Sequence, residues 1–466
     1  MQINFAKRWI YVLCALFLSV SAFAQQYYIA DIALQGNHRT QSHIILRELD
    51  IQKGDSVKIQ RLAHVLKVSK ENLDNLSLFN YVDIYWAPSS EDTHNITITI
   101  RVEERWYFLP FVSIKYEERN VSAWLKNFDL GRTTVEVGAQ IYNLFGLNHS
   151  LVAGIQFGYR QALNFTYKNI TLDKRQKHFL TAGASMQRSH YMNVMTISDT
   201  PLSIKTPDLI LEQSLDLFFH YTYRYNVRIT HNVSLFSEYK KIADTILLVN
   251  PNYWGNSHRE RLNLQLQYFF KTDQRDYAPY PLKGYFLKVG ANLYASHDLS
   301  VRYAQLNANA QYFKKWSDRW FSEERITAGV SAKNRKAYVL DQALGYGENV
   351  LRGYEYHVID GQYYTTLNNT IKYNIVPKTI FVVNWLSALP KFNKIHFALY
   401  AHAFVDMGAA FHHYPDPSNQ LSNQFLYSGG VGLDLVTYYD IVFTLSYSIN
   451  RQGERGIYFS FKLPFL

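Results

Sequence analysis

Hydrophobic and polar residues alternate with a two-residue period along most of the chain after residue 105. In Arg261–Phe270 (RLNLQLQYFF), leucines and aromatic residues occupy one face, while an arginine and amide residues occupy most of the other. Tyr303–Phe313 and Leu211–Tyr223 repeat this pattern. Such alternation is typical of β-strands with one wet face. The pattern predicts about sixteen strands between Trp106 and Leu466.

The polar face of these strands is rich in amides and poor in charge, and the apolar face ends in tyrosines and phenylalanines. A soluble β-sandwich also alternates, but it packs its apolar faces into a thin core. A closed barrel instead turns its apolar face to lipid and satisfies every backbone group in the bilayer. We therefore expect residues 105–466 to form a transmembrane barrel of antiparallel strands. The longest expected loops are Ser198–Asp208, Ala243–Glu260, Ala337–Gly361 and Tyr414–Gln424.

Residues 25–104 carry a different pattern, which predicts a small α/β domain. Apolar residues recur at helical spacing in two segments, and short runs of alternating residues flank them. The expected order is β-α-α-β-β: Tyr27–Asn37, Thr40–Leu49, Lys58–Asn75, Tyr81–Trp86 and Asn95–Arg105.

The first 24 residues have the features of a signal peptide. Lys7 and Arg8 precede an apolar run of about a dozen residues, which is too short to span a membrane as a helix. Ala22-Phe23-Ala24 then provides a small-residue cleavage site. The single cysteine, Cys14, lies inside this segment, so the mature chain has no disulfide or thiolate chemistry. We expect an exported protein.

Composition narrows the classes further. The formal net charge is +10, but charged residues are only 18% and aromatic residues reach 16%, which is unlike a polybasic nucleic-acid binder. The basic cluster of Lys333, Arg335 and Lys336 is expected to face anionic lipid headgroups, with an ordinary solvated loop as an equal alternative.

The sequence shows no motif of an enzyme. Gly345-Tyr346-Gly347 lacks the third glycine of a dinucleotide site, and no nucleophile elbow or zinc-protease helix is present. His412 and His413 together with Asp406 could suggest a metal site, but a histidine pair at a loop or lumen edge is the favoured interpretation. We expect no catalysis, cofactor or metal, although a barrel enzyme with scattered site residues is an alternative.

Two groups of residues together resemble a known family. In the N-terminal domain, Gly36-Asn37, Arg39-Thr40, Gly54-Asp55 and Val102-Glu103-Glu104 resemble a POTRA domain. In the barrel region, an L-R-G-Y loop (Leu351–Tyr354) precedes about five strands, and Phe404–Gly408 reads F-x-D-x-G. The whole mature chain thus resembles the POTRA-barrel assembly and translocation superfamily, BamA/TamA-like and also called bacterial surface antigen, in a short form with a single POTRA.

This resemblance implies a specific contact inside the barrel. The long loop would fold into the lumen and place Arg352 against Asp406, since a planar guanidinium matches a carboxylate that is shielded from water. The other implied participants are Gly353 at the sharp turn, Tyr354 beside it, Gly408 on the wall, and Gly345 and Gly347 ahead of the loop tip.

Two further features could act on other polypeptides. A sheet edge can accept an extended peptide as an added strand; the expected edge is Tyr81, Val82, Asp83, Ile84, Tyr85 and Trp86, and a capped spacer is the alternative. Prolines in the first and last expected strands, Pro110 and Pro464, each remove one ladder donor. Together with Phe465 they mark a weak seam, unless Pro464 merely ends its strand.

From these features we expect a bacterial outer-membrane protein with its POTRA domain in the periplasm. It would assist assembly, insertion or translocation of unfolded outer-membrane or exported client proteins, in contact with outer-membrane lipid and with periplasmic chaperones or accessory subunits as further partners; no nucleic acid is involved. Room for one POTRA favours a specialised or accessory role. The alternatives are a dedicated translocation pore for one secreted or surface partner and a passive structural barrel or porin.

Overall fold

A computed structural model describes residues 26–89, 92–116, 133–347, 349–382, 384, 394–437 and 440–462. The chain divides into two compact units, Met1–Arg105 and Trp106–Leu466. The predicted signal peptide, residues 1–24, lies outside the described residues. Among the described helices, none is long and apolar enough to cross a membrane.

The part of the first unit that the structure describes is a four-stranded sheet with two helices. Its elements are β1 (Gln26–Gln35), α2 (Ser42–Leu46), β2 (Ser56–Lys58), α3 (Ile59–Asp74), β3 (Phe79–Pro88) and β4 (Asn95–Glu104). The sheet order is β2-β1-β4-β3, with β1 and β4 parallel. Leu62, Val65 and Leu73 of α3 are buried, as the helical spacing predicts. Only the three-residue strand β2 was not predicted, because it is too short to show a period.

Glu104 at the end of β4 closes this unit. Its carboxylate accepts hydrogen bonds from the backbone N–H groups of Arg39 (3.1 Å) and Thr40 (2.7 Å) and from the Thr40 hydroxyl (2.6 Å). The Arg39-Thr40 pair and the terminal acidic residue, which are far apart in the sequence, therefore meet in the fold.

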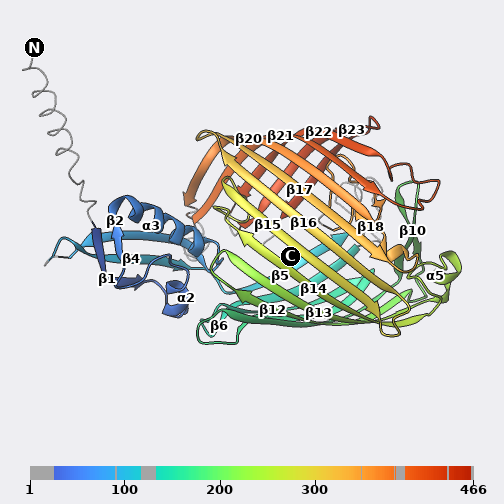
Figure 1. Cartoon of the computed structure of the whole chain (residues 1–466), viewed down its shortest axis with the longest axis horizontal. Helices are drawn as coiled ribbons and strands as arrows, with labels where there is room; N and C mark the ends of the chain where they lie inside the picture. The colour runs from blue at the N-terminus through green and yellow to red at the C-terminus, as the bar shows by residue number, and fades with distance from the viewer. Residues whose placement is uncertain are drawn as a thin grey trace, which may run out of the picture. The chain divides into compact units, whose positions relative to one another are not determined.

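In its described residues, the second unit forms a sheet of sixteen antiparallel strands, in agreement with the predicted number. Figure 1 shows this sheet curving into a barrel. Its strands are, in wall order, β5 (Phe108–Tyr116), β6 (Thr133–Leu144), β7 (His149–Gly158), β8 (Arg160–Thr171), β9 (His178–Ser189), β12 (Glu212–Arg224), β13 (Ile229–Ile242), β14 (Glu260–Asp273), β15 (Gly284–Ser296), β16 (Arg302–Lys315), β17 (Trp320–Lys333), β20 (Tyr363–Val382), β21 (Lys394–Phe411), β22 (Phe425–Thr437), β23 (Val442–Asn450) and β24 (Arg455–Lys462). We call the end at which β5 begins the entry mouth and the opposite end the far mouth.

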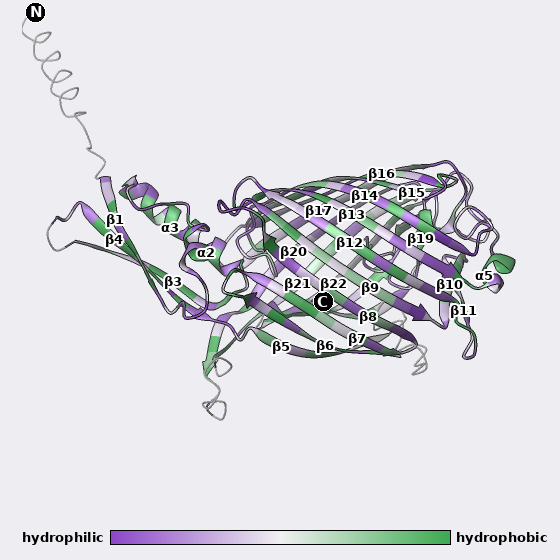
Figure 2. Ribbon diagram, turned by 90° about the horizontal axis from the view of Figure 1, so that it is seen from below, coloured by the Kyte–Doolittle hydropathy of each residue, from purple (hydrophilic) through white to green (hydrophobic). Residues whose placement is uncertain are grey.

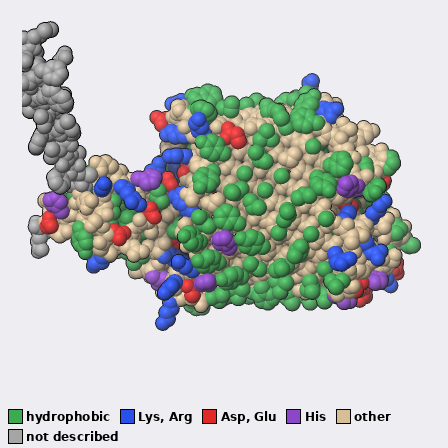
Figure 3. All heavy atoms as spheres, in the orientation of Figure 1, with side chains coloured by type: hydrophobic (Ala, Val, Ile, Leu, Met, Phe, Trp, Pro, Cys, Tyr) green, Lys and Arg blue, Asp and Glu red, His purple; other side chains and the backbone are tan. Residues whose placement is uncertain are grey.

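The wall separates an apolar outside from a polar inside. On β14, Leu264 and Leu266 are 45% and 46% exposed, whereas Asn263 is 3% exposed. Figure 2 shows hydrophilic and hydrophobic residues alternating along the strands, and Figure 3 shows hydrophobic side chains spread over the outer wall with charged ones gathered towards the two ends. This is the arrangement that a lipid-facing barrel requires.

Smaller elements connect the strands at the far mouth. They are the hairpin β10 (Tyr191–Ile197) and β11 (Thr200–Lys205), the helix α5 (Asp244–Val249), the 3-10 turn η2 (Tyr338–Leu340) and the short pair β18 (Gln342–Leu344) and β19 (Ile359–Asp360). The segment Ser198–Asp208 was expected to be a loop. Most of it instead belongs to the hairpin, whose tip residues Ser198 and Asp199 both have positive φ.

Candidate functional site

Residues 334–362, here called the luminal loop, connect β17 to β20 and fold into the barrel. Gly345 and Gly353 take φ values of +82° and +87°, which turn the chain sharply. The loop is anchored by a buried apolar cluster that it shares with the wall and with the connection between β21 and β22: Ala343, Leu344, Leu351, Tyr354, Ile359, Tyr364, Ala410, Leu421 and Leu426.

Arg352 and Asp406 lie in direct contact. Nε and Nη2 of Arg352 donate to the two carboxylate oxygens of Asp406 at 2.7 and 2.6 Å, so the pair is bidentate. The Asp406 side chain is fully buried and that of Arg352 is 27% exposed. Asp406 also accepts from the Arg352 backbone N–H at 3.3 Å and from the Asn368 amide at 2.7 Å. A bidentate pair in this setting fixes both position and orientation of the loop.

Four neighbouring strands hold the same turn. On β20, Thr370 accepts a hydrogen bond from Arg352 at 3.0 Å, and on β21 the Phe404 ring lies 3.9 Å from the guanidinium carbon. Ser428 of β22 donates to the Arg352 carbonyl, and Asn450 of β23 donates to the Gly353 carbonyl at 2.9 Å. The contact set, here called the loop clasp, therefore spans β20 to β23.

The predicted glycines differ in how tightly they are confined. A Cβ on Gly353 would lie 2.8 Å from Cβ of Ser428, and one on Gly345 would lie 2.4 Å from the His357 carbonyl oxygen. A Cβ on Gly408 would lie 3.4 Å from Leu351, so this glycine brings the loop close to the wall. Gly347 has positive φ but open space around it. Tyr354, next to Gly353, is buried and its hydroxyl donates to the Tyr427 carbonyl at 3.1 Å.

Glu355 follows the clasp in the loop, outside the membrane-spanning strands. Burial raises the pKa of Glu355 to about 7. Its Oε2 accepts a hydrogen bond from the Gly353 N–H at 2.7 Å. This acceptor stabilises the turn from the loop side.

A second segment, which the sequence did not indicate, folds inward from the entry mouth. Residues 274–283, here called the strap, connect β14 to β15 but reach across to β21–β23. The Tyr280 hydroxyl donates to Asp434 at 2.8 Å, and the Tyr277 hydroxyl donates to Asp440. Rings and aliphatic groups of Tyr280, Phe321, Ala398, Tyr400, Val436 and Val442 form a buried cluster around the strap. The strap is longer than the neighbouring turn 316–319, and this length was the signal in the sequence that could have indicated an inward fold.

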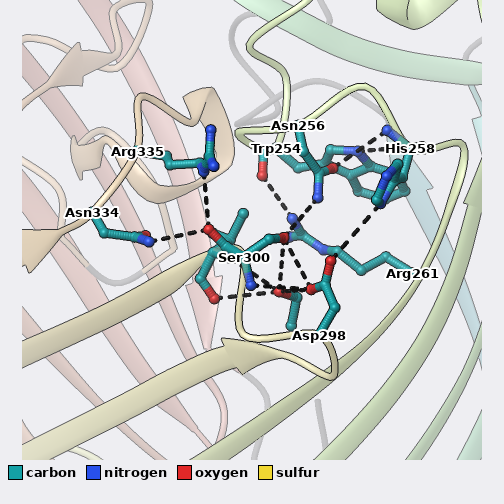
Figure 4. A network of polar contacts seen from close by, with 10 residues as sticks. Trp254, Asn256, His258, Arg261, Asp298, Ser300, Asn334 and Arg335 are labelled. Atoms are coloured by element: carbon teal, nitrogen blue, oxygen red, sulfur yellow. Dashed lines mark hydrogen bonds and ion pairs between the residues drawn. The ribbon is translucent and has the colours of Figure 1, made fainter.

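Three connections at the far mouth are tied together by a polar network (Figure 4). Arg261 donates to the Trp254 carbonyl at 2.6 Å and its guanidinium lies 4.8 Å from the Trp254 ring centre. The Ser300 carbonyl accepts from Asn334 and from Arg335, each at 3.0 Å. The Asn256 amide donates to the Ser300 hydroxyl at 3.0 Å, so the network joins the segments before β14, between β15 and β16, and after β17.

The network also corrects the expectation for the basic cluster. Lys333 forms an ion pair with Asp341, and its side chain is only 11% exposed, so it does not face lipid headgroups. Arg335 is exposed and bound to the Ser300 carbonyl, and the Lys336 ammonium lies 4.9 Å from the Tyr414 ring centre. His412, considered above with Asp406, instead lies 3.5 Å from Asp341.

The predicted peptide-binding edge is an outer strand of its sheet. β3 pairs with β4 along Phe79–Pro88, and the sheet order ends at β3. Tyr85 and Trp86 are exposed, Asp83 is exposed, and Val82 is buried. Tyr81 and Ile84 are half-buried. The Lys70 ammonium of α3 donates to the Val82 carbonyl, so one backbone acceptor of this strand is already occupied.

The predicted seam is described only in part. Pro110 lies in β5, opposite Ala139 of β6. Pro464 and Phe465 lie outside the described residues. Within the described chain, the hydrogen-bonded order runs from β5 at one end to β24 at the other, and each of these two strands pairs with one described neighbour.

A cavity of 1470 Å³ lies inside the barrel. Amide side chains of β14, β15 and β16 line it, including Asn263, Asn292 and Asn309. The charged lining residues that are described comprise seven cations and one anion: Lys240, Arg261, Lys271, Arg275, Lys288, Arg325, Lys462 and Glu238. The lumen along β14–β16 is therefore polar and cationic.

A sixteen-stranded lipid-facing barrel, a loop clasped in its lumen and a small N-terminal α/β unit define an outer-membrane barrel protein with a POTRA domain. The Omp85 superfamily domain matches residues 143–463, and the surface antigen variable number repeat, a POTRA domain, matches residues 27–105. The chain belongs to the Omp85 superfamily, which confirms the family that the motifs indicated. No functionally curated protein matches the chain.

Solved structures show the same fold. BamA from Haemophilus ducreyi lacking POTRA domains 1–3 aligns with a TM-score of 0.52 at 14% identity, over 93% of this chain and 84% of that chain. CdiB from Acinetobacter baumannii aligns with a TM-score of 0.51 at 14% identity, over 94% and 73%. CdiB from Escherichia coli aligns with a TM-score of 0.52 at 12% identity, over 93% and 76%. At these identities the likeness concerns the fold alone.

Proposed function

We propose that this protein assists the assembly, insertion or translocation of client polypeptides at the outer membrane, with its POTRA domain in the periplasm. The observation that carries the proposal is the loop clasp: a family-type barrel keeps a loop locked in its lumen by a buried bidentate ion pair. The luminal loop occupies part of the channel, which argues against a wide, open passive pore.

Client capture is assigned to β3. Its position at the end of the sheet order leaves room for an added strand, and backbone hydrogen bonds would supply affinity without a sequence requirement. The exposed rings of Tyr85 and Trp86 would then contact alternate side chains of the client.

Client release is assigned to the seam between β5 and β24. Pro110 weakens the ladder of β5, and both strands lie at the ends of the described order. The single cysteine of the sequence, Cys14, lies in the predicted signal peptide, so pairs introduced along β5 and β24 can be crosslinked selectively once that segment is removed. The control pair is Ala308→Cys with Ala328→Cys, which lie directly opposite on β16 and β17 within the fixed wall. We expect the seam crosslink to abolish client assembly and the control to preserve it. Full activity with the seam closed would refute the role of the seam.

A dedicated translocation pore is the second candidate, favoured by the cavity of 1470 Å³ with its polar, cationic lining. Depletion of the protein followed by quantification of the outer-membrane and secreted proteomes separates the candidates. A general loss of barrels supports assembly, and loss of one exported protein supports the pore. If neither proteome changes, a purely structural role for the barrel is the remaining interpretation, and the proposal is contradicted.

A further inference from the structure

A groove of 640 Å³ lies on the outer wall near the entry mouth. Its floor is made by neighbouring strands β17, β20 and β21. Its apolar lining includes Trp316, Trp320, Ile371 and Val405. Ile371 and Val405 are 56% and 50% exposed, which places the groove on the lipid-facing side. Tryptophans of this kind mark the level of the lipid headgroups in barrel walls.

Glu324 is a charged residue on this lipid-facing wall. It pairs across the sheet with Tyr312 on one side and Asn369 on the other, and Tyr312 is 52% exposed on the outer face. Its Oε2 is buried, and no described residue donates a hydrogen bond to it. No ion pair of Glu324 is found among the described residues either. Such a carboxylate at a bilayer surface is costly unless something outside the chain supplies a donor.

A cation of the protein lies nearby on the same face. Lys314 of β16 pairs with Ser322, which is two residues from Glu324, so Lys314 and Glu324 are diagonal neighbours at about 7–8 Å between backbones. The Lys314 ammonium lies 3.6 Å from the Trp316 ring centre, and the Trp316 indole donates to Ser322 at 3.0 Å. The groove therefore has one carboxylate, that of Glu324, in its lining, and one ammonium, that of Lys314, next to it over the Trp316 ring.

We propose that this groove binds a phospholipid whose headgroup carries a primary ammonium next to its phosphate. The ammonium donates hydrogen bonds to Glu324, the phosphate pairs with Lys314, and an acyl chain covers Ile371 and Val405. The charge pattern selects this occupant, because an anionic lipid without an amine offers Glu324 no cationic donor, only neutral hydroxyl groups at most. A quaternary amine carries the positive charge but has no N–H group to donate.

The test is retention of lipid by the purified full-length protein, measured by native mass spectrometry after detergent exchange. Phosphatidylethanolamine, phosphatidylglycerol and phosphatidylcholine are offered separately. We expect preferential retention of phosphatidylethanolamine and about a tenfold loss of it in Glu324→Gln, as expected for one charge-assisted hydrogen bond. Lys314→Gln should lower the retention of phosphatidylethanolamine and of phosphatidylglycerol equally, because both lipids carry the phosphate that pairs with Lys314.

The matched control is Glu260→Gln, the same change at an exposed glutamate that pairs with Lys241 at the far mouth. It should retain lipid as the unmodified protein does. Heat-modifiability on gels verifies that each variant is folded, and the conservative Glu324→Asp should recover part of the preference. Equal retention of the three lipids would overturn the proposal, as would unchanged phosphatidylethanolamine retention in Glu324→Gln. Finding a bound protein, and no lipid, in the groove at Glu324 would also overturn it.

Discussion

Two segments fold into this barrel from opposite mouths, and they are held by different chemistry. The loop clasp uses a guanidinium and a fully buried carboxylate, whereas the strap uses neutral tyrosine hydroxyls and a cluster of rings. In both cases the acceptor is an aspartate on the C-terminal part of the wall, Asp406 on β21 and Asp434 on β22. The comparison indicates that this part of the wall anchors both segments. The loop clasp reaches it through a pair of opposite charges, whereas the strap reaches it through neutral hydroxyl donors.

The largest effect is expected from breaking the charge pair. Arg352→Ala or Asp406→Ala leaves an unpaired charge in the lumen and should cost about 3–5 kcal/mol of unfolding free energy. The double variant should cost less than the sum of the two, because no charge is then stranded. Urea unfolding in lipid vesicles, followed by tryptophan fluorescence, measures all three.

The control for this series is Lys241→Ala. Lys241 and Glu260 form an ion pair at 2.6 Å, but both side chains are more than 40% exposed. Such a pair contributes about 0–1 kcal/mol. If the Arg352 and Asp406 variants lost no more unfolding free energy than this control, the pair in the loop clasp would behave as an ordinary solvent-exposed ion pair. The contrast with the strap would then disappear.

The geometry of the loop turn gives the next largest effect. Gly353→Ala places a Cβ at positive φ and 2.8 Å from Ser428, so it should cost about 2–3 kcal/mol. Gly453→Ala has a similar φ of +80° with nothing within 4 Å, and should cost about 1 kcal/mol. The same urea titration compares them. Equal losses would mean that the turn is not pressed against β22.

A smaller effect is expected at the strap. Tyr280→Phe removes the hydroxyl, but Asp434 keeps His402 at 3.0 Å and Thr444 at 2.7 Å, so the loss should be about 1 kcal/mol. Tyr280→Ala also removes the ring and should cost about 3 kcal/mol. Tyr285→Phe, at a residue 47% exposed on the wall, is the neutral control. A Tyr280→Phe variant as unstable as Tyr280→Ala would show that polar bonding, and not packing, holds the strap.

The two segments also differ in how far their contacts could be predicted from the sequence. The loop clasp carries short motifs around Arg352 and Asp406, and the wall follows from simple alternation. The strap reads QRDYAPYPLK, an ordinary turn, and its acceptors Asp434 and Asp440 lie in another hairpin far along the chain. Local patterns specify strands and turns, but a contact between distant segments becomes visible only when the barrel closes.

The smallest effect is expected where the strap approaches the last strand. The Lys462 ammonium of β24 donates to the Pro279 carbonyl at 3.4 Å in an exposed position, so Lys462→Gln should change stability by less than about 0.5 kcal/mol. The unfolding titration used for the strap variants applies here. A small effect means that the strap is anchored on β21–β23 and leaves β24 able to move at the seam. A loss as large as that of Tyr280→Ala would instead tie the strap to β24, and then opening the seam would require release of the strap.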